Sequence, residues 1–308
     1  MTCVRRRVGR QNHSPAAVLG MITMATARAS SSTKTVTSLE DISGTRGTDF
    51  ITVTRSVGGD SLDLEGGYDR LVLRADGNTV LLSNVESVLG SDGFDLITLE
   101  TRLTSGKVDL GGDDDKLVFS DDGATGTVLN IETIVGGDAT ESLVFAARAF
   151  TIINLADGND KITLGKYNNR LTISNIETVV GSSLSDNIVV TSESDGVRID
   201  LGAGKDKIVF DQAVTATLAN IETIVGSDED DDISVSTIST KSTIDVGDGE
   251  DILSLGNFTN TLTILNAESI AGGTNVDLVT LGAAAHNVEI DLEGGKDKIT
   301  LGNFANTV

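Results

Sequence analysis

The chain has 308 residues, and its 46 acidic and 23 basic side chains give it a formal net charge of −23. So acidic a chain should repel nucleic acid and anionic membranes and should attract cations. The single cysteine, Cys3, excludes an internal disulfide. No apolar run is long enough to span a bilayer. We therefore expect neither nucleic acid nor a membrane span.

Residues 1–35 differ from the rest of the chain. A cluster of arginines is followed by the moderately apolar stretch 16–25 and then by small residues. This order is typical of a secretory signal, although Gly20 and Thr23 interrupt the apolar part; a disordered leader is the alternative. We interpret 1–35 as a disordered leader or a signal segment, and 36–308 as one repeat domain.

One phrase recurs throughout residues 36–308. At Asp200 it is DLGAGKDKIVF, and its copies start 45 or 46 residues apart. A second phrase, Asn-x-Glu followed by a Gly-containing turn, alternates with the first. So regular a period indicates a solenoid built from stacked supersecondary units. The first phrase begins at Asp63, Asp109, Asn154, Asp200, Asp245 and Asp291, and the second at Asn84, Asn130, Asn175, Asn220 and Asn266.

Each unit holds two Gly/Asp turns, and each turn leads into a strand with apolar residues at alternate positions. Neither helical periodicity nor a repeated hairpin spacing is present. We predict an all-β, parallel, right-handed β-solenoid (β-roll or β-helix) of about 12 coils with about 23 residues each. The last eight residues copy 255–262 and stop in mid-unit, so we expect the domain to be truncated at its C-terminus.

The Gly/Asp turns are the candidate sites for chemistry. Glycine permits positive φ and can turn carbonyl oxygens towards a common point, while aspartate adds a charged oxygen. Ca²⁺ is bound by such mixtures of carboxylate and carbonyl oxygens, and an ion between stacked turns would offset the repulsion within a column of aspartates. The alternative is that Gly and Asp are simply good turn formers and that Asp caps its own turn.

These turns resemble the G-G-x-G-x-D-x-U-x nonapeptide of RTX (hemolysin-type) calcium-binding repeats. In GSDGFDLIT the matching residues are Gly90, Gly93, Asp95 and Ile97. The resemblance implies a secreted β-roll that binds Ca²⁺ in its turns. Here the turns are isolated rather than tandem, and Glu141 replaces one aspartate, so fewer and weaker sites are expected. The candidate metal residues are Asp69, Asp95, Asp115, Asp160, Asp206, Asp251, Asp277 and Asp297, with Gly66, Gly90, Gly93, Gly111, Gly202, Gly204, Gly247, Gly249 and Gly294.

The Asn-x-Glu phrase is interpreted as structural. Stacked asparagines can bond side chain to side chain at a coil corner. The glutamates recur only every second predicted coil, which favours a solvated or corner role over a ligand role.

An enzyme is not expected, because the chain has only two histidines, His13 and His286, and every carboxylate pair belongs to the repeat. We expect a segment of a larger bacterial secreted or surface protein that folds on binding Ca²⁺ and acts as a structural or adhesive stalk. Cell-surface or polysaccharide ligands are candidate partners. Two alternatives are a metal-independent structural or adhesin solenoid and a non-catalytic part of a polysaccharide-processing enzyme.

Overall fold

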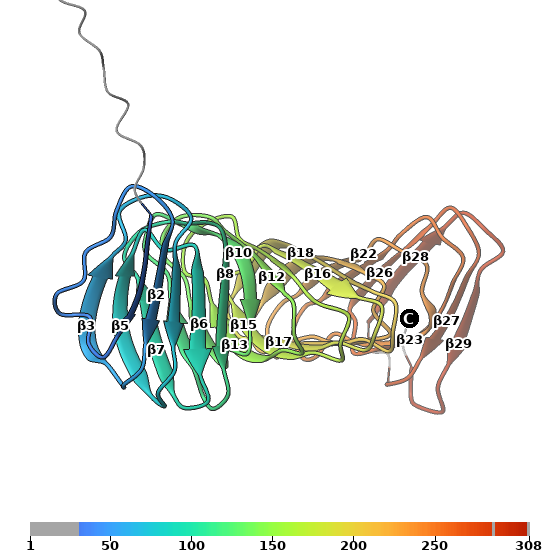
Figure 1. The fold of residues 1–308 in the computed structure, drawn as a ribbon. Coiled ribbons are helices and arrows are strands. Elements are labelled where there is room, and N and C mark those ends of the chain that lie inside the picture. Colours follow the sequence, from blue (N-terminus) through green and yellow to red (C-terminus); the bar gives the residue numbers. More distant parts are fainter. Residues whose placement is uncertain (1–30, 285–286, 307–308) are drawn as a thin grey trace, which may run out of the picture.

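The computed structural model describes residues 31–284 and 287–306, and within these ranges every regular element is a β-strand. Strands stack along a rod, as Figure 1 shows from the blue to the red end of the chain. The leader predicted for 1–35 lies mostly outside the described residues. Its last residues belong to β1 (Ser32–Val36), which pairs with β2, so the first strand begins four residues before the predicted boundary.

Two parallel sheets form opposite walls of the rod, and from β2 onward each turn of the chain places one strand in each wall. The first sheet has 15 strands and the second has 14. This confirms the predicted all-β parallel solenoid. The first sheet contains β1 (Ser32–Val36), β2 (Asp49–Val53), β4 (Arg70–Leu73), β6 (Ser87–Ser91), β8 (Leu103–Gly111), β10 (Ala124–Leu129), β12 (Glu141–Phe145), β14 (Lys161–Thr163), β16 (Thr178–Ser182), β18 (Ser194–Gly202), β20 (Val214–Ala219), β22 (Asp232–Val235), β24 (Ile252–Leu255), β26 (Ser269–Gly273) and β28 (Glu289–Glu293).

From β2 onward, the strands of the second sheet alternate with those of the first along the chain. They are β3 (Gly58–Asp63), β5 (Asn78–Ser83), β7 (Asp95–Leu99), β9 (Lys116–Val118), β11 (Thr133–Val135), β13 (Phe150–Asn154), β15 (Arg170–Ser174), β17 (Asn187–Val190), β19 (Lys207–Phe210), β21 (Thr223–Val225), β23 (Thr240–Asp245), β25 (Asn260–Leu265), β27 (Asp277–Leu281) and β29 (Lys298–Leu301).

The coil is shorter than the predicted value of about 23 residues. Register partners in successive coils are most often 17 or 20 residues apart, as for Arg70 with Ser87 and Phe50 with Arg70. The separation of 26 residues between Asp69 and Asp95 is therefore not one long coil. It is one coil of 17 residues, from Asp69 to Glu86, followed by a half-turn into the other sheet. Each repeat thus spans two and a half coils, and successive repeats lie on opposite sides of the rod.

The core is a continuous column of aliphatic side chains between the two sheets. In β7, Ile97 and Leu99 point inward and are buried, while Leu96 and Thr98 are partly exposed. The same alternation occurs in most strands, because successive side chains of a strand point to opposite faces. Burying each Ile, Leu or Val contributes about 1.5–3 kcal/mol, so the stacked rows supply most of the cohesion between coils.

Candidate functional site

Acidic side chains from successive coils form a repeated structure, which we call a carboxylate ladder. In one ladder the backbone N–H of Asp95 donates to Oδ1 of Asp115 at 2.7 Å, and the N–H of Asp115 donates to Oε2 of Glu132 at 2.9 Å. Each residue thereby anchors the start of its strand to the next coil. The ladders are Asp49–Asp69–Glu86, Asp95–Asp115–Glu132, Glu141–Asp160–Glu177, Asp186–Asp206–Glu222 and Asp231–Asp251–Glu268, with the shorter pair Asp277–Asp297 in the last repeat.

The first aspartate of a ladder is buried and well supplied with donors. The Asp95 side chain is fully buried, and its Oδ2 accepts the backbone N–H of Ser91 at 2.7 Å. Its Oδ1 accepts Nδ2 of Asn78, one coil earlier, at 2.6 Å. A desolvated carboxylate is tolerated only when it has such partners. These bonds tie the Gly/Asp turn both to itself and to the preceding coil.

The second aspartate of a ladder differs, because one of its oxygens has no donor. Oδ2 is buried without a hydrogen-bond partner in Asp69, Asp115, Asp160, Asp206 and Asp251. Burial, the largest cause, raises the pKa of Asp115 and of Asp251 to about 7, and the negative charges of their ladder neighbours act in the same direction. These carboxyls are therefore partly protonated near neutral pH.

Asp49, a first aspartate, shows the opposite balance. Burial acts to raise its pKa, but hydrogen bonds from Ser32 and Thr45 outweigh burial and hold the pKa below the usual value. The difference between the two positions therefore follows from the donors that each carboxylate meets.

Glu141 occupies a first position with a different set of neighbours. Its register partner in the preceding coil is Ala124, and Gly137 stands where Ser91 supplies a hydroxyl in another repeat. Neither Glu141 carboxyl oxygen has a donor, although the side chain is fully buried. Burial first, and then the charge of Asp160, raises the pKa of Glu141 to about 8.

Glycines let adjacent turns pack backbone to backbone. Gly111 has φ +106°, and a Cβ built on it would lie 1.8 Å from the carbonyl oxygen of Ser91 in the preceding coil. A Cβ on Gly90 would lie 2.5 Å from Oδ2 of Asp95. The glycines of the repeat therefore make room for close turn packing and for the buried carboxylate.

A Ca²⁺ ion requires about six to eight oxygen ligands, which the predicted calcium-binding residues would have to supply. The first aspartate of a ladder uses both oxygens to accept N–H groups, and the second uses Oδ1 in the same way. In each of the five three-membered ladders, one buried aspartate oxygen is left without a hydrogen-bond donor. In the part of the chain that the structure describes, no group of three or more His, Cys, Asp or Glu side chains is arranged to hold a metal ion. In this arrangement the aspartate oxygens cap N–H groups, and a bound Ca²⁺ ion would have to displace some of these hydrogen bonds.

The structure brings most of the predicted residues together in the ladder turns. Asp69, Asp115, Asp160, Asp206 and Asp251 are second members, Asp95 and Asp277 are first members, and Asp297 closes the last pair. Gly111, Gly202, Gly247 and Gly249 have positive φ. Gly66, Gly90, Gly93, Gly204 and Gly294 lie in the same turns with ordinary φ.

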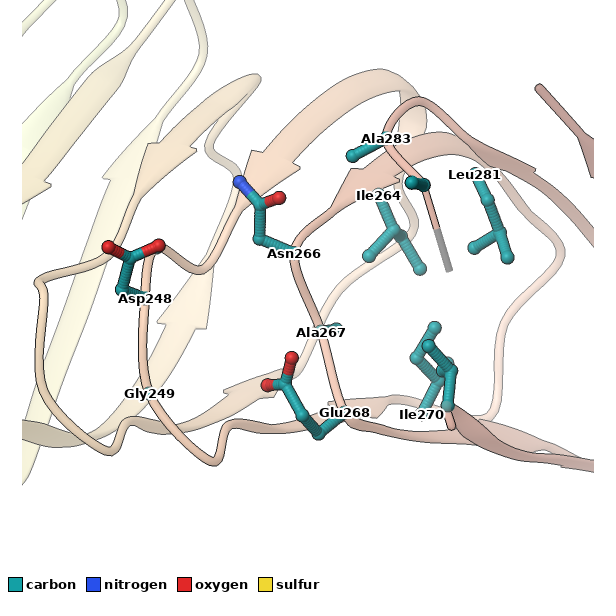
Figure 2. A pocket seen from close by; sticks show the side chains of 12 residues that line it. Asp248, Gly249, Ile264, Asn266, Ala267, Glu268, Ile270, Leu281 and Ala283 are labelled. Atoms are coloured by element: carbon teal, nitrogen blue, oxygen red, sulfur yellow. The ribbon is translucent and has the colours of Figure 1, made fainter. Parts of the chain in front are cut away.

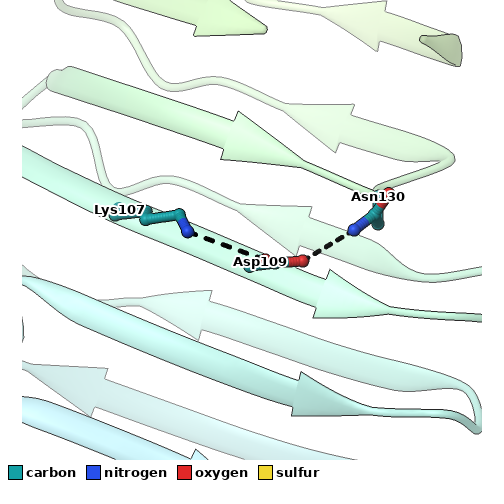
Figure 3. A network of polar contacts seen from close by, with 3 residues as sticks. All are labelled: Lys107, Asp109 and Asn130. Atoms are coloured by element: carbon teal, nitrogen blue, oxygen red, sulfur yellow. Dashed lines mark hydrogen bonds and ion pairs between the residues drawn. The ribbon is translucent and has the colours of Figure 1, made fainter. Parts of the chain in front are cut away.

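The asparagines of the Asn-x-Glu phrase do not stack on one another as predicted. Asn130 has φ +52°, and its Nδ2 donates to Oδ1 of Asp109 in the preceding coil at 2.7 Å; Lys107 pairs with the same carboxylate at 3.7 Å (Figure 3). Equivalent asparagines lie two and a half coils apart on opposite sides of the rod, so they cannot meet. The predicted corner role holds, with Asp rather than Asn as the usual partner.

The short coils leave pockets at their corners. Near Asn266 and Glu268, a pocket of about 210 Å³ lies between the turn at Asp248 and the loop at Ala283 (Figure 2). A pocket of similar volume lies at Asn175. The corner at Asn266 has three residues between strands, whereas the corners of the preceding and following coils have six and seven, so it is recessed.

Two groups of ladder residues were not among the predicted site residues. The glutamates of the Asn-x-Glu phrase complete the ladders, and Asn78, Asn169 and Asn260 donate to the first aspartates at the second sheet. These three asparagines are 91 residues apart. The sequence signal for these asparagines is a period of 91 residues, which is twice the length of one repeat and corresponds to five coils.

Comparisons with known proteins gave no family model, no curated protein and no solved structure that matches this chain. Within the described ranges, no helix could cross a membrane.

Proposed function

We propose that the chain is a structural solenoid that acts as a stiff stalk or spacer in a larger secreted or surface protein, and that its coils hold together without metal. The observation that carries this proposal is the carboxylate ladder. At each Gly/Asp corner, backbone N–H groups bond to carboxylates of the next coil, so that acidic side chains anchor the stack instead of repelling it.

The rest of the geometry supports a mechanical role. The two sheets run without interruption from β1 to β29, and the aliphatic core is continuous between them. At a strand spacing of about 4.8 Å, the stack is roughly 65–70 Å long.

Small-angle X-ray scattering in EGTA tests the proposal. We expect a rod of roughly that length with a constant cross-section. A scattering profile typical of an expanded chain in EGTA would contradict it.

A calcium-dependent stalk is the second candidate function. The observation that favours it is the second aspartate of each ladder, whose buried Oδ2 lacks a donor in five repeats. Binding of Ca²⁺ would have to rearrange the N–H bonds that now occupy the other oxygens. Circular dichroism during a Ca²⁺ titration separates the candidates: a β-sheet signal that grows with calcium supports this one, and a signal already complete in EGTA supports the first.

A further inference from the structure

One region of the surface reverses the charge of the rod. Four consecutive coils, those of β13, β15, β17 and β19, present the exposed cations Arg148, Lys166, Arg170, Lys205 and Lys207 on the side of the second sheet. We call these five residues, together with Phe150, Tyr167 and Leu184, the basic patch. The two acids in the turns and second-sheet strands that carry the patch, Asp186 and Asp206, are buried ladder members.

The turns of the patch lie directly against one another. Phe150 is the register partner of Arg170, which in turn pairs with Asn187, and Asn187 pairs with Lys207. Between the turns, Nε of Arg148 donates to the carbonyl oxygen of Asn168 at 2.9 Å. The patch is therefore one surface, and its four strands span roughly 15–20 Å along the rod.

Apolar side chains lie among the cations. Phe150, Tyr167 and Leu184 are 53%, 43% and 45% exposed. The guanidinium of Arg148 lies 4.4 Å from the centre of the Phe150 ring. Within the described residues the only salt bridge is that between Lys107 and Asp109, so the cations of the patch are not neutralised by carboxylates of the rod.

The same chain supplies a comparison. Residues 91 positions earlier occupy equivalent places in the solenoid, and there the exposed turn residues include Asp76, Asp92 and Asp114. Their counterparts in the patch are Tyr167, Ser183 and Lys205. The fold therefore accepts acids at these places, and the structural role of the turns does not require the basic charge.

We propose that the basic patch binds an acidic polysaccharide, a chain of sugars that carry carboxylates. Guanidinium and ammonium groups pair with carboxylates through charge-assisted hydrogen bonds. Phe150 and Tyr167 offer flat apolar surfaces to sugar rings, and the exposed polar groups of Asn168 and Ser183 suit sugar hydroxyls.

Charge favours this ligand over nucleic acid. Double-stranded DNA carries about one charge per 1.7 Å, and the rest of the rod, with a chain net charge of −23, repels such a polyanion. A polysaccharide with one carboxylate per sugar has a lower charge density. It therefore meets weaker repulsion from the acids that border the patch.

This inference deepens the proposed stalk by giving it an adhesive surface, and it rests on the rod being folded as described. The test uses the full chain and oligogalacturonate, with a neutral glucan of the same length and a single-stranded DNA as competing probes. Isothermal titration calorimetry at low and physiological salt measures the affinities. Scattering of the same samples shows whether the rod is intact, so loss of the rod is distinguished from loss of binding.

The patch variant Lys166→Ala, Arg170→Thr, Lys205→Ser removes three positive charges, and its first two changes install the residues found 91 positions earlier. The control variant Arg70→Ser, Lys161→Ser, Arg198→Thr removes three positive charges from the first sheet. We expect the patch variant to bind oligogalacturonate at least about tenfold more weakly, because charge-assisted bonds are lost. The control variant should bind like the unmodified chain.

Four results would overturn the inference while the rod is intact. These are no binding of oligogalacturonate by the unmodified chain at low salt, equal weakening in both variants, equal affinity for the neutral glucan, and tighter binding of the single-stranded DNA.

Discussion

Single carboxylates contribute to the stability of the contact between two coils. Asp95 is fully buried and accepts hydrogen bonds from Asn78 and Ser91. Asp95→Ala would leave these donors unsatisfied, and each unsatisfied donor costs about 1–3 kcal/mol. We expect a loss of roughly 3 kcal/mol or more in the free energy of unfolding, measured with urea. The control is Asp92→Ala, an exposed residue of the same turn, which should change stability by no more than about 0.5 kcal/mol.

The second aspartates and Glu141 make stability depend on pH. Their folded-state pKa values lie above the ordinary values, so folding favours the protonated form. This contribution is complete below the ordinary carboxyl pKa and is lost as pH rises through about 6 to 8. The urea midpoint should therefore fall between pH 5 and pH 8. A midpoint that rises over this range would contradict the buried ladders. The groups with raised values in this range are Asp115, Glu141, Asp160, Asp206 and Asp251.

At the scale of the element, the short corner depends on one residue with positive φ. Asn130 has φ +52° and bonds to Asp109 of the preceding coil. Asn130→Val places a β-branched residue in the left-handed region and removes the bond, and the left-handed region alone costs about 1–2 kcal/mol for such residues. The melting temperature should fall clearly. Glycine adopts positive φ without strain, so Asn130→Gly loses only an exposed hydrogen bond and should lower the melting temperature much less. Equal decreases in the two variants would show that the backbone conformation is not the cause.

The strands themselves were predictable from the sequence, but the length of the coil was not. The alternation of apolar and polar residues in segments such as 95–99 shows which side chains face the core. This inference needs only the two-residue period of a β-strand. Spacing between like motifs, however, does not show that they lie on the same side of the rod. Asp69 and Asp95 end similar turns in opposite sheets, so their separation includes half a coil that sequence spacing alone cannot reveal.

The turn residues were also predictable as a set, while their role was not. Gly and Asp at a turn are compatible with a metal ligand and with a backbone cap. The choice depends on which donors approach each oxygen from the neighbouring coil, as the N–H of Asp95 does for Asp115. Those N–H donors are 17 to 20 residues away in the sequence from the carboxylates that they contact. Their direction follows from the register of the paired strands, which the sequence does not show.

At the scale of the whole molecule, the acidity of the chain is divided between the interior and the surface. The buried acids serve cohesion between coils, while the exposed ones give the rod its negative field. The basic patch interrupts that field over four coils. A stiff acidic rod with one basic, aromatic surface is suited to holding a ligand at a fixed place along its length.

In the proposed stalk, carboxylate ladders join the coils without a metal ion. The most direct test is urea unfolding of the chain at pH 7, followed by the β-sheet circular dichroism signal, once in EGTA and once in millimolar Ca²⁺. We expect a folded chain in EGTA and the same urea midpoint in both solutions. A chain that is unfolded in EGTA and folds when calcium is added would contradict it.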